Sequence, residues 1–273
     1  MVNTDLKYHN YRIPVPAAYE AVFTHFYFAA NKSKTTITKK LLPSFQKIML
    51  FNFGSPTIIH SPQRTEIIVE KCLVLGPIKQ AFDYSLLPDS EILVANFKDD
   101  AFYRFFGDAA AGVNLPIHPD ELLHENCFTA LWTVLHGIQD THEKVDFILE
   151  YCKPYLNPQG TIATQLTHIS NGNLNPIKVV ASKRQQTERH IQQEYKRQFG
   201  YTAKEKMRYH RFLIAVERLE EIASHDGSVN WFEIVDDCGY YDQSQLIRDF
   251  KYYIGMSPMK YLKFQQDICT AKP

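Results

Sequence analysis

The sequence predicts an α+β protein in which an antiparallel β-domain comes first and an all-helical domain follows. Two observations lead to this prediction. Runs of β-branched and aromatic residues, separated by turn residues, dominate the first hundred positions, and helical periodicity takes over near Asp100. The chain has 273 residues, 45% of them hydrophobic, which is enough for two domains with separate cores. We place these domains at residues 1–157 and 158–273.

Three runs in the first domain are predicted to be strands: Lys47–Phe53, Thr65–Leu75 and Ser90–Phe97. Turn signals such as residues 54–56 and Gly76-Pro77 separate them at the spacing of short antiparallel strands. This pattern favours a small barrel or sandwich over about the first 98 residues, because parallel strands would need helical crossovers between them.

A helical pair is expected between about residues 99 and 157. One helix is predicted over Asp120–Gly137, and a second begins where Asp140 and Glu143 resemble a capping box. The apolar residues of this pair suit packing onto the barrel and a dimer interface equally well. The turn-rich stretch Asn157–Gly160 marks the predicted domain boundary.

The second domain contains an internal repeat with an offset of 55 residues, which aligns residues 191–200 with 246–255. In both copies apolar residues at i, i+4 and i+8 form a buried stripe, and a glycine follows that can end the helix in the left-handed conformation. A short helix, a brief turn and a second helix are therefore predicted twice, at about 176–200 and 230–255, with Thr187 and Asp242 as the N-caps of the second helices. A longer helix from about 203 to 224 joins the two helix-turn-helix units.

The polar faces opposite these stripes carry side chains suited to DNA. They are Arg189, Gln192, Gln193 and Lys196 in the first unit, and Gln243, Ser244 and Arg248 in the second. Arginine and glutamine can pair bidentately with guanine and adenine in the major groove, where a helix fits. Ordinary solvated surface explains either face equally well when it is considered alone.

Charge is distributed unevenly along the chain, although 30 basic and 30 acidic residues give a net charge of zero. Residues 178–211 contain 10 Lys+Arg against 3 Asp+Glu, whereas residues 212–273 contain 6 against 10. A compact basic stretch is the electrostatic footprint of nucleic-acid binding, because neutralising phosphates supplies most non-specific affinity.

Residues 239–261, GYYDQSQLIRDFKYYIGMSPMKY, resemble the signature of the AraC/XylS family of bacterial transcription regulators. Ala181–Lys204 is similar to the first half of the same DNA-binding domain. The resemblance implies two recognition helices that enter successive major-groove segments. The residues that match base-reading positions are Arg189, Gln192, Gln193, Gln243, Ser244 and Arg248. We assign phosphate contacts to Thr187, Lys196, Arg197, Lys204 and Lys251.

Departures from the family pattern leave the DNA target open. Gln245 stands where the family often has histidine, and Gln193 where arginine is frequent. Acidic residues including Asp249 make the second unit more acidic than a strong DNA anchor. We therefore expect the first unit to supply most of the affinity, and the second to set register through Arg248 and Lys251.

The first domain resembles the cupin-like β-barrel sensors found ahead of this DNA-binding domain, an architecture that comes without a ligand assignment. Aromatic residues there could line a ligand cavity or fill the core. The predicted pocket residues are Phe26, Phe28, Phe45, Phe51 and Phe53.

Other functional classes find little support in the sequence. The five cysteines are scattered without a CxxC pair, and no HxH, HExxH, GxSxG or phosphate-loop motif occurs. We therefore predict no metal, no cofactor and no catalytic residue. No secretory signal and no apolar run of membrane-spanning length is visible, so a cytoplasmic protein is expected.

The sequence thus predicts a sequence-specific DNA-binding transcription regulator, responsive to a small-molecule effector and not an enzyme. Its expected partners are double-stranded DNA, a second copy of the chain and, for an activator, RNA polymerase. Two alternatives stay open: a cupin-type small-molecule binder or enzyme with an appended DNA domain, and an interaction protein that has lost DNA binding. Steep loss of affinity with salt would distinguish a true DNA binder.

Overall fold

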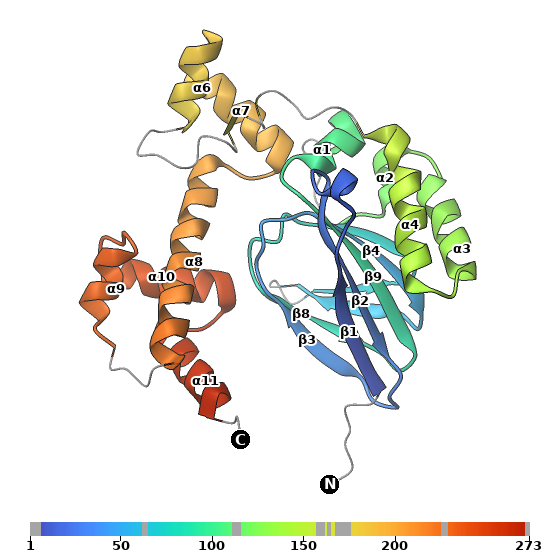
Figure 1. Cartoon of the computed structure of the whole chain (residues 1–273), viewed down its shortest axis with the longest axis horizontal. Coiled ribbons are helices and arrows are strands. Elements are labelled where there is room, and N and C mark those ends of the chain that lie inside the picture. The colour runs from blue at the N-terminus through green and yellow to red at the C-terminus, as the bar shows by residue number, and fades with distance from the viewer. Residues whose placement is uncertain are drawn as a thin grey trace. The chain divides into compact units, whose positions relative to one another are not determined.

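The structure is a computed structural model that describes residues 7–61, 65–110, 116–156, 162, 165–166, 176–224 and 229–270 (Figure 1). The strands are β1 (Tyr8–Ile13), β2 (Phe23–Asn31), β3 (Ile37–Leu41), β4 (Ile48–Gly54), β5 (Thr57–His60), β6 (Glu66–Val69), β7 (Cys72–Leu75), β8 (Phe82–Leu86) and β9 (Ser90–Phe97). The α-helices are α1 (Ala101–Phe106), α2 (Pro119–Leu123), α3 (Cys127–Gly137), α4 (Thr141–Cys152), α6 (Pro176–Arg184), α7 (Glu188–Phe199), α8 (Ala203–Ser224), α9 (Trp231–Asp237), α10 (Gln243–Ile254) and α11 (Pro258–Thr270). Short 3-10 helices are η2 (Ala17–Tyr19), η3 (Gly107–Ala110) and η4 (Lys153–Tyr155).

The chain divides into two compact units. The first comprises residues 1–78 and 82–202, with all of these strands and helices α1 to α7, and the second comprises residues 79–81 and 203–273, with helices α8 to α11. The predicted domain boundary at residues 157–158 lies outside the described residues. The division between the units comes later, between Thr202 and Ala203, so that α6 and α7 belong to the unit that contains the strands.

The strands of the first unit form two antiparallel sheets. One has the order β1-β2-β9-β4-β7 and the other β3-β8-β5-β6. Their facing side chains share a core that includes Ile48, Leu50 and Ile92 from the first sheet and Ile59 and Leu86 from the second. The predicted α+β class is confirmed, but the described strands form two separate sheets instead of a closed barrel.

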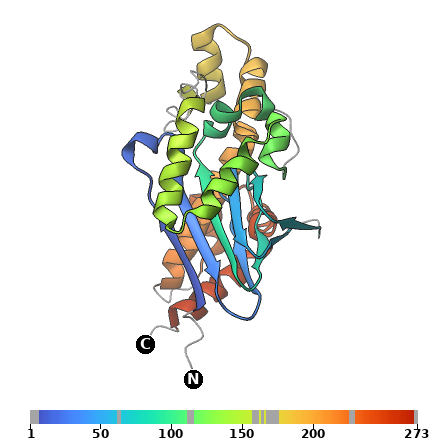
Figure 2. The same ribbon diagram turned by 90° about the vertical axis from the view of Figure 1, so that its right-hand side faces the viewer.

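Helices cover the other face of the five-stranded sheet, as Figure 2 shows for α3 and α4 (yellow-green). Because side chains alternate along a strand, Met49 and Phe51 of β4 face these helices while Ile48 and Leu50 face the second sheet. The indole Nε1 of Trp132 on α3 donates to a carbonyl of β4 at 2.7 Å. Both faces of β4, β7 and β9 are therefore buried, which explains the nearly continuous apolar runs of these strands.

Two predicted elements of the first unit are interrupted. The run Thr65–Leu75 was expected to be one strand, but it contains β6 in one sheet and β7 in the other. The predicted helix over Asp120–Gly137 is divided into α2 and α3 at His124, which adopts a left-handed φ of 55°. The carboxylate of Asp120 accepts hydrogen bonds from the amides of Phe128 at 2.7 Å and Thr129 at 3.0 Å. Asp120 thereby caps the N-terminus of α3, at a place where the continuous apolar periodicity predicted no new helix.

The second unit is built around α8, a helix of 22 residues against which α10 and α11 pack. Phe212 of α8 packs edge-on against Phe250 of α10, with ring centroids 5.0 Å apart. The segment Lys79–Ala81 also belongs to this unit, and the Ala81 amide donates to the carbonyl of Tyr253 at the end of α10 at 2.8 Å.

Candidate nucleic-acid interface and ligand cavity

Helix α7 is delimited by its own sequence. The hydroxyl of Thr187 accepts a hydrogen bond from the amide of His190 at 3.2 Å, which caps the N-terminus. Gly200 ends the helix with a φ of 80°, and its amide donates to the carbonyl of Lys196 at 2.9 Å. Ile191 and Phe199 lie on the buried face. The predicted stripe and the predicted cap are both confirmed.

The opposite face of α7 is open to solvent. Its exposed residues include all of those predicted to contact DNA from this helix: Arg189, Gln192, Gln193, Lys196 and Arg197. Arg197 differs from the others because its guanidinium pairs with Asp108 at 3.1 Å and with Glu194 at 3.0 Å. It also lies 5.3 Å from the ring centroid of Tyr103. A phosphate contact by Arg197 therefore requires it to leave Asp108.

Helix α10 has the same design. An oxygen of Asp242 accepts from the amide of Gln245 at 2.7 Å, and Gly255 ends the helix with a φ of 74°. The side chain of Gln245, where the family often has histidine, accepts from the amide of Tyr241 at 3.0 Å and so helps to cap the helix. The exposed residues again include the predicted contacts: Gln243, Ser244, Arg248 and Lys251.

The internal repeat extends beyond the recognition helices. Helices α6, α7 and α8 begin at Pro176, Glu188 and Ala203, and α9, α10 and α11 begin 55 residues later at Trp231, Gln243 and Pro258. The two N-cap residues, Thr187 and Asp242, obey the same offset. Both helix-turn-helix units therefore share one local design. Lys204, the remaining predicted phosphate contact, is exposed in the first turn of α8.

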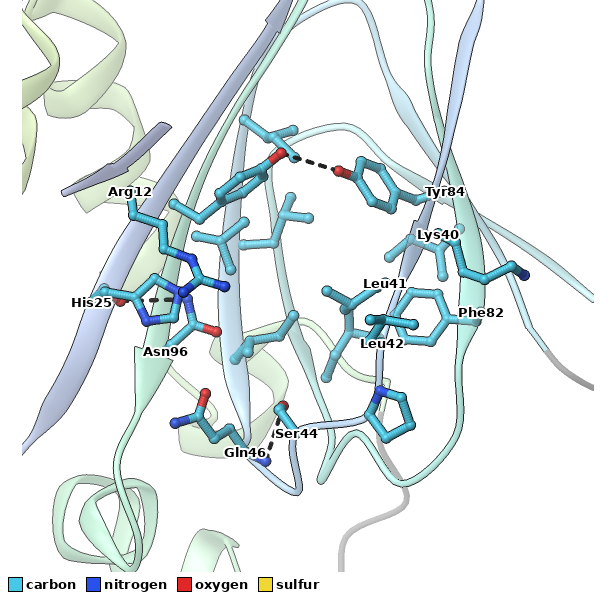
Figure 3. A pocket seen from close by; sticks show the side chains of 18 residues that line it. Arg12, His25, Lys40, Leu41, Leu42, Ser44, Gln46, Phe82, Tyr84 and Asn96 are labelled. Atoms are coloured by element: carbon cyan, nitrogen blue, oxygen red, sulfur yellow. Dashed lines mark hydrogen bonds between the residues drawn. The ribbon is translucent and has the colours of Figure 1, made fainter. Parts of the chain in front are cut away.

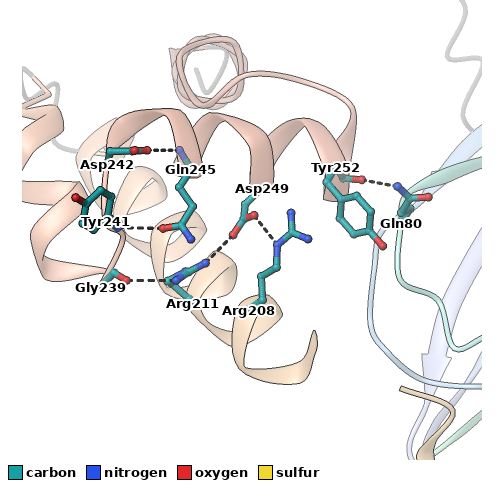
Figure 4. Close-up of polar contacts among 9 residues, drawn as sticks. All are labelled: Gln80, Arg208, Arg211, Gly239, Tyr241, Asp242, Gln245, Asp249 and Tyr252. Atoms are coloured by element: carbon teal, nitrogen blue, oxygen red, sulfur yellow. Dashed lines mark hydrogen bonds and ion pairs between the residues drawn. The ribbon is translucent and has the colours of Figure 1, made fainter. Parts of the chain in front are cut away.

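A buried carboxylate fastens α10 to α8 (Figure 4). Asp249 is 1% exposed, and its two oxygens bind Nε of Arg208 at 2.7 Å and Nη2 of Arg211 at 3.4 Å. The guanidinium of Arg211 also lies 4.4 Å from the ring centroid of the buried Tyr240. Asp249 therefore adds no negative charge to the exposed face of α10. This burial weakens our expectation that the second helix-turn-helix unit is too acidic to anchor on DNA.

Sequence reasoning missed two exposed aromatic residues beside the second recognition helix. Tyr241 is 92% exposed directly before the N-cap of α10, and Phe232 is 87% exposed in the first turn of α9. Large apolar side chains are usually covered in folded proteins. The signal that could have revealed Tyr241 is its place in the turn, outside the apolar stripe of both neighbouring helices.

A cavity of about 370 Å³ lies in the first unit, between the two sheets (Figure 3). Its size is typical of small-molecule sites. The wall is mainly apolar and includes Ile48, Val94 and Phe82. Polar side chains also line it: Arg12, His25, Tyr27, Lys40, Ser44, Gln46, Tyr84 and Asn96.

The charges at the cavity favour an anion. Lys40 is paired with Asp83 at 2.6 Å, whereas Arg12 makes no ion pair with any carboxylate among the residues that the structure describes. Burial and the nearby Arg12 lower the pKa of His25, so this imidazole is neutral near pH 7 and can accept or donate a hydrogen bond. An apolar space beside an unpaired guanidinium suits a molecule with a hydrophobic body and an acidic group.

None of the five phenylalanines predicted to form a pocket lines this cavity. Phe26, Phe28, Phe51 and Phe53 belong to the core between the five-stranded sheet and the helices. Phe45 packs edge-on against Tyr201, with ring centroids 5.1 Å apart. The structure therefore places these rings in the core, which was the second of the two interpretations of the aromatic pattern. The polar residues that line the cavity were not recognised from the sequence.

The described part of the chain shows neither a membrane-spanning helix nor a metal-binding cluster. None of its helices is both long and apolar enough to cross a bilayer. Within the same residues, no group of three or more His, Cys, Asp or Glu side chains is placed to hold a metal ion.

The repeated capped helices define a class of domain. The family model described as a helix-turn-helix domain matches residues 180–263, a range that contains both recognition helices. The C-terminal region is therefore a helix-turn-helix DNA-binding domain of the AraC type.

Solved structures show what the longer chain is similar to. A structure of ToxT from Vibrio cholerae is 11% identical, covers 95% of this chain and 98% of its own, and has a TM-score of 0.41. ToxT from Vibrio cholerae strain SCE256 with a bound unsaturated fatty acid is 12% identical, with 96% and 97% coverage and a TM-score of 0.39. An RmlC-like cupin protein from Desulfovibrio desulfuricans is 11% identical over 34% of this chain and 84% of its own, with a TM-score of 0.25. No curated protein sequence matches this chain.

Proposed function

We propose that the protein is a sequence-specific DNA-binding transcription regulator whose DNA affinity is controlled by a small molecule in the cavity between the two sheets. The observation that carries the proposal is the pair of matched helices α7 and α10. Each is capped by a side chain, ended by a left-handed glycine and buried along one stripe, and each exposes arginine and glutamine on the other side. Such helices can enter a major groove and pair with base edges.

Residue roles follow from this proposal. Bases are read by Arg189, Gln192, Gln193, Gln243, Ser244 and Arg248. Phosphates are bound by Thr187, Lys196, Arg197, Lys204 and Lys251.

The proposal also covers location and partners. We place the protein in the bacterial cytoplasm, as a homodimer that contacts RNA polymerase where it activates transcription. The exposed Val134 of α3 and Phe147 of α4 support a dimer contact through these helices. The proposed function includes no catalysed reaction.

Binding to DNA is expected to weaken steeply with salt. Four cations are assigned to phosphates, and each phosphate neutralised contributes about −0.9 to the slope of log affinity against log salt. Affinity for duplex DNA should therefore fall roughly 100-fold between 50 and 200 mM salt. Fluorescence anisotropy with a duplex from the region upstream of the protein's own gene, beside a random duplex, measures both the slope and the preference.

The result decides among the functions considered. Salt-sensitive binding that favours the upstream duplex supports a regulator. Salt-sensitive binding without preference for any upstream fragment supports a small-molecule binder with an appended DNA domain. Absence of binding at low salt, with and without ligand, supports an interaction protein.

The cavity is expected to bind a straight-chain carboxylate more tightly than the matching alcohol. Decanoate offers an apolar chain for the sheet-lined wall and a charge for Arg12, whereas decanol offers only the chain. Arg12→Gln should weaken decanoate binding roughly 10-fold, the loss expected when one charge-assisted hydrogen bond is removed, and leave decanol unchanged. Isothermal titration calorimetry gives both constants.

Lys32→Gln is the matched control, because Lys32 is an exposed cation at the end of β2 that does not line the cavity. An equal loss of decanoate binding in the Lys32 and Arg12 variants would show general electrostatic attraction. Equal affinity of the wild-type protein for decanoate and decanol would contradict an anionic effector.

A further inference from the structure

The segment Ser44–Ile48, which leads into β4, has two faces. Ser44, Gln46 and Ile48 line the cavity, and Figure 3 shows the labelled Ser44 and Gln46 at its edge. The intervening Phe45 and Lys47 do not line it and are buried elsewhere. One stretch of backbone therefore carries both sets of side chains.

Lys47 holds the C-terminal end of α7. Its side chain is buried, and Nζ donates to the carbonyl of Gln198 in the last turn of α7 at 3.4 Å. The last carbonyls of a helix carry partial negative charge, so an ammonium group there is favourable. Burial lowers the pKa of Lys47 to about 8, and at neutral pH the amine is still mostly protonated.

Phe45 reaches the same end of α7 from an unusual backbone conformation. Its φ is 58°, which bulky residues rarely adopt. The amides of Ser44 and Phe45 both donate to the carbonyl of Ile78 at 3.0 Å, which fixes this turn. The ring of Phe45 therefore meets Tyr201, a buried residue that directly follows the terminal Gly200 of α7.

We infer that the segment Ser44–Ile48 couples the cavity to recognition helix α7. A ligand that displaces the cavity-lining side chains also moves Phe45 and Lys47, and with them the C-terminal end of α7. Phe45 and Lys47 are then positioning residues for the DNA-reading face of that helix. The inference rests on the proposed function and adds to it the route by which the cavity acts on DNA affinity.

Gly200 and Gly255 provide a matched pair of probes. Both end a recognition helix with a left-handed φ, so an added methyl group strains both backbones alike. At Gly200 a Cβ atom would lie 3.1 Å from Cε of Lys47 and 3.2 Å from Cδ of Pro77, whereas at Gly255 it would meet no atom within 4 Å. Gly200→Ala therefore disturbs the contact with Lys47, and Gly255→Ala reproduces only the backbone strain.

The experiment measures coupling in the full chain, with decanoate as the probe. The wild-type protein, Lys47→Met, Gly200→Ala and Gly255→Ala are compared by DNA anisotropy with and without decanoate, after circular dichroism shows that each is folded. Methionine replaces the buried charge by an apolar chain of similar length, so this variant should fold. In parallel, hydrogen exchange of the amides in the last turn of α7 is followed with and without decanoate, because this measurement does not depend on DNA binding.

We expect decanoate to change the DNA affinity of the wild-type protein and of Gly255→Ala by about 5-fold or more, a usual size for coupling between sites. The change should fall below about 2-fold in Lys47→Met and Gly200→Ala, and the decanoate effect on exchange in α7 should disappear with it. Equal coupling in all four proteins, or bound decanoate without any effect on α7 exchange in the wild type, would overturn the inference. Failure to bind decanoate would overturn the effector site itself, and failure to bind DNA would overturn the regulator while the exchange data still decide the coupling.

Discussion

Simultaneous replacement of Arg189 and Arg248 by alanine is expected to weaken binding to the preferred duplex by roughly 100-fold or more, because each bidentate base contact is worth about 1–3 kcal/mol. Both arginines lie on the exposed faces of their recognition helices, and neither forms an ion pair with another described residue. Binding to random duplex should fall much less, since these side chains are assigned to bases. Anisotropy titrations with the two duplexes at one salt concentration measure the difference.

Two single variants serve as controls for this double variant. Lys196→Ala should weaken binding to both duplexes alike, because a phosphate contact is insensitive to sequence. Arg218→Ala removes an exposed arginine of α8 that pairs with Glu221 at 3.1 Å, outside both recognition helices, and should leave both affinities unchanged. If the double variant lost affinity for preferred and random duplex in equal measure, the assignment of these arginines to bases would be wrong.

Replacement of Asp249 by asparagine is expected to destabilise the second unit by about 3 kcal/mol, because it leaves Arg208 and Arg211 without their shared carboxylate in a largely buried site. This loss of unfolding free energy is at the low end for a buried ion pair, because the Arg208 side chain is 40% exposed. The chain has two tryptophans, and only Trp231 belongs to the second unit. Urea denaturation followed by Trp231 fluorescence in a Trp132→Phe background therefore measures this unit.

Asp237→Asn is the control for this prediction. Asp237 lies 3.8 Å from Arg218, and both side chains are about half exposed, so the pair should contribute less than about 1 kcal/mol. A comparable loss of stability in the two variants would mean that the buried network does not fasten α10 to α8. Weaker DNA binding by Asp249→Asn, beyond what the unfolded fraction explains, is expected because α10 loses its support.

Local patterns predicted much of the helical region. The apolar stripes, the terminal glycines and the cap residues Thr187 and Asp242 act within a few residues of each other, so the sequence was sufficient to place α7 and α10. The strand Ser90–Phe97 was likewise predicted with the bounds that the structure shows. The weaker predictions concern the run Thr65–Leu75, where the chain passes from one sheet to the other, and the helix over Asp120–Gly137, where a side-chain cap interrupts a continuous apolar pattern.

The sequence by itself thus determined the α+β class, the 55-residue repeat and the exposed polar faces of α7 and α10, because periodicity and capping are local properties of the chain. The cavity was decided only by the tertiary structure, since Arg12, His25 and Asn96 lie on different strands and no spacing links them. The role of Asp249 depended on the same level of structure, because a carboxylate that looks solvated on a polar helix is buried between two arginines of α8. Long-range packing, which joins residues far apart in the chain, brings these groups together.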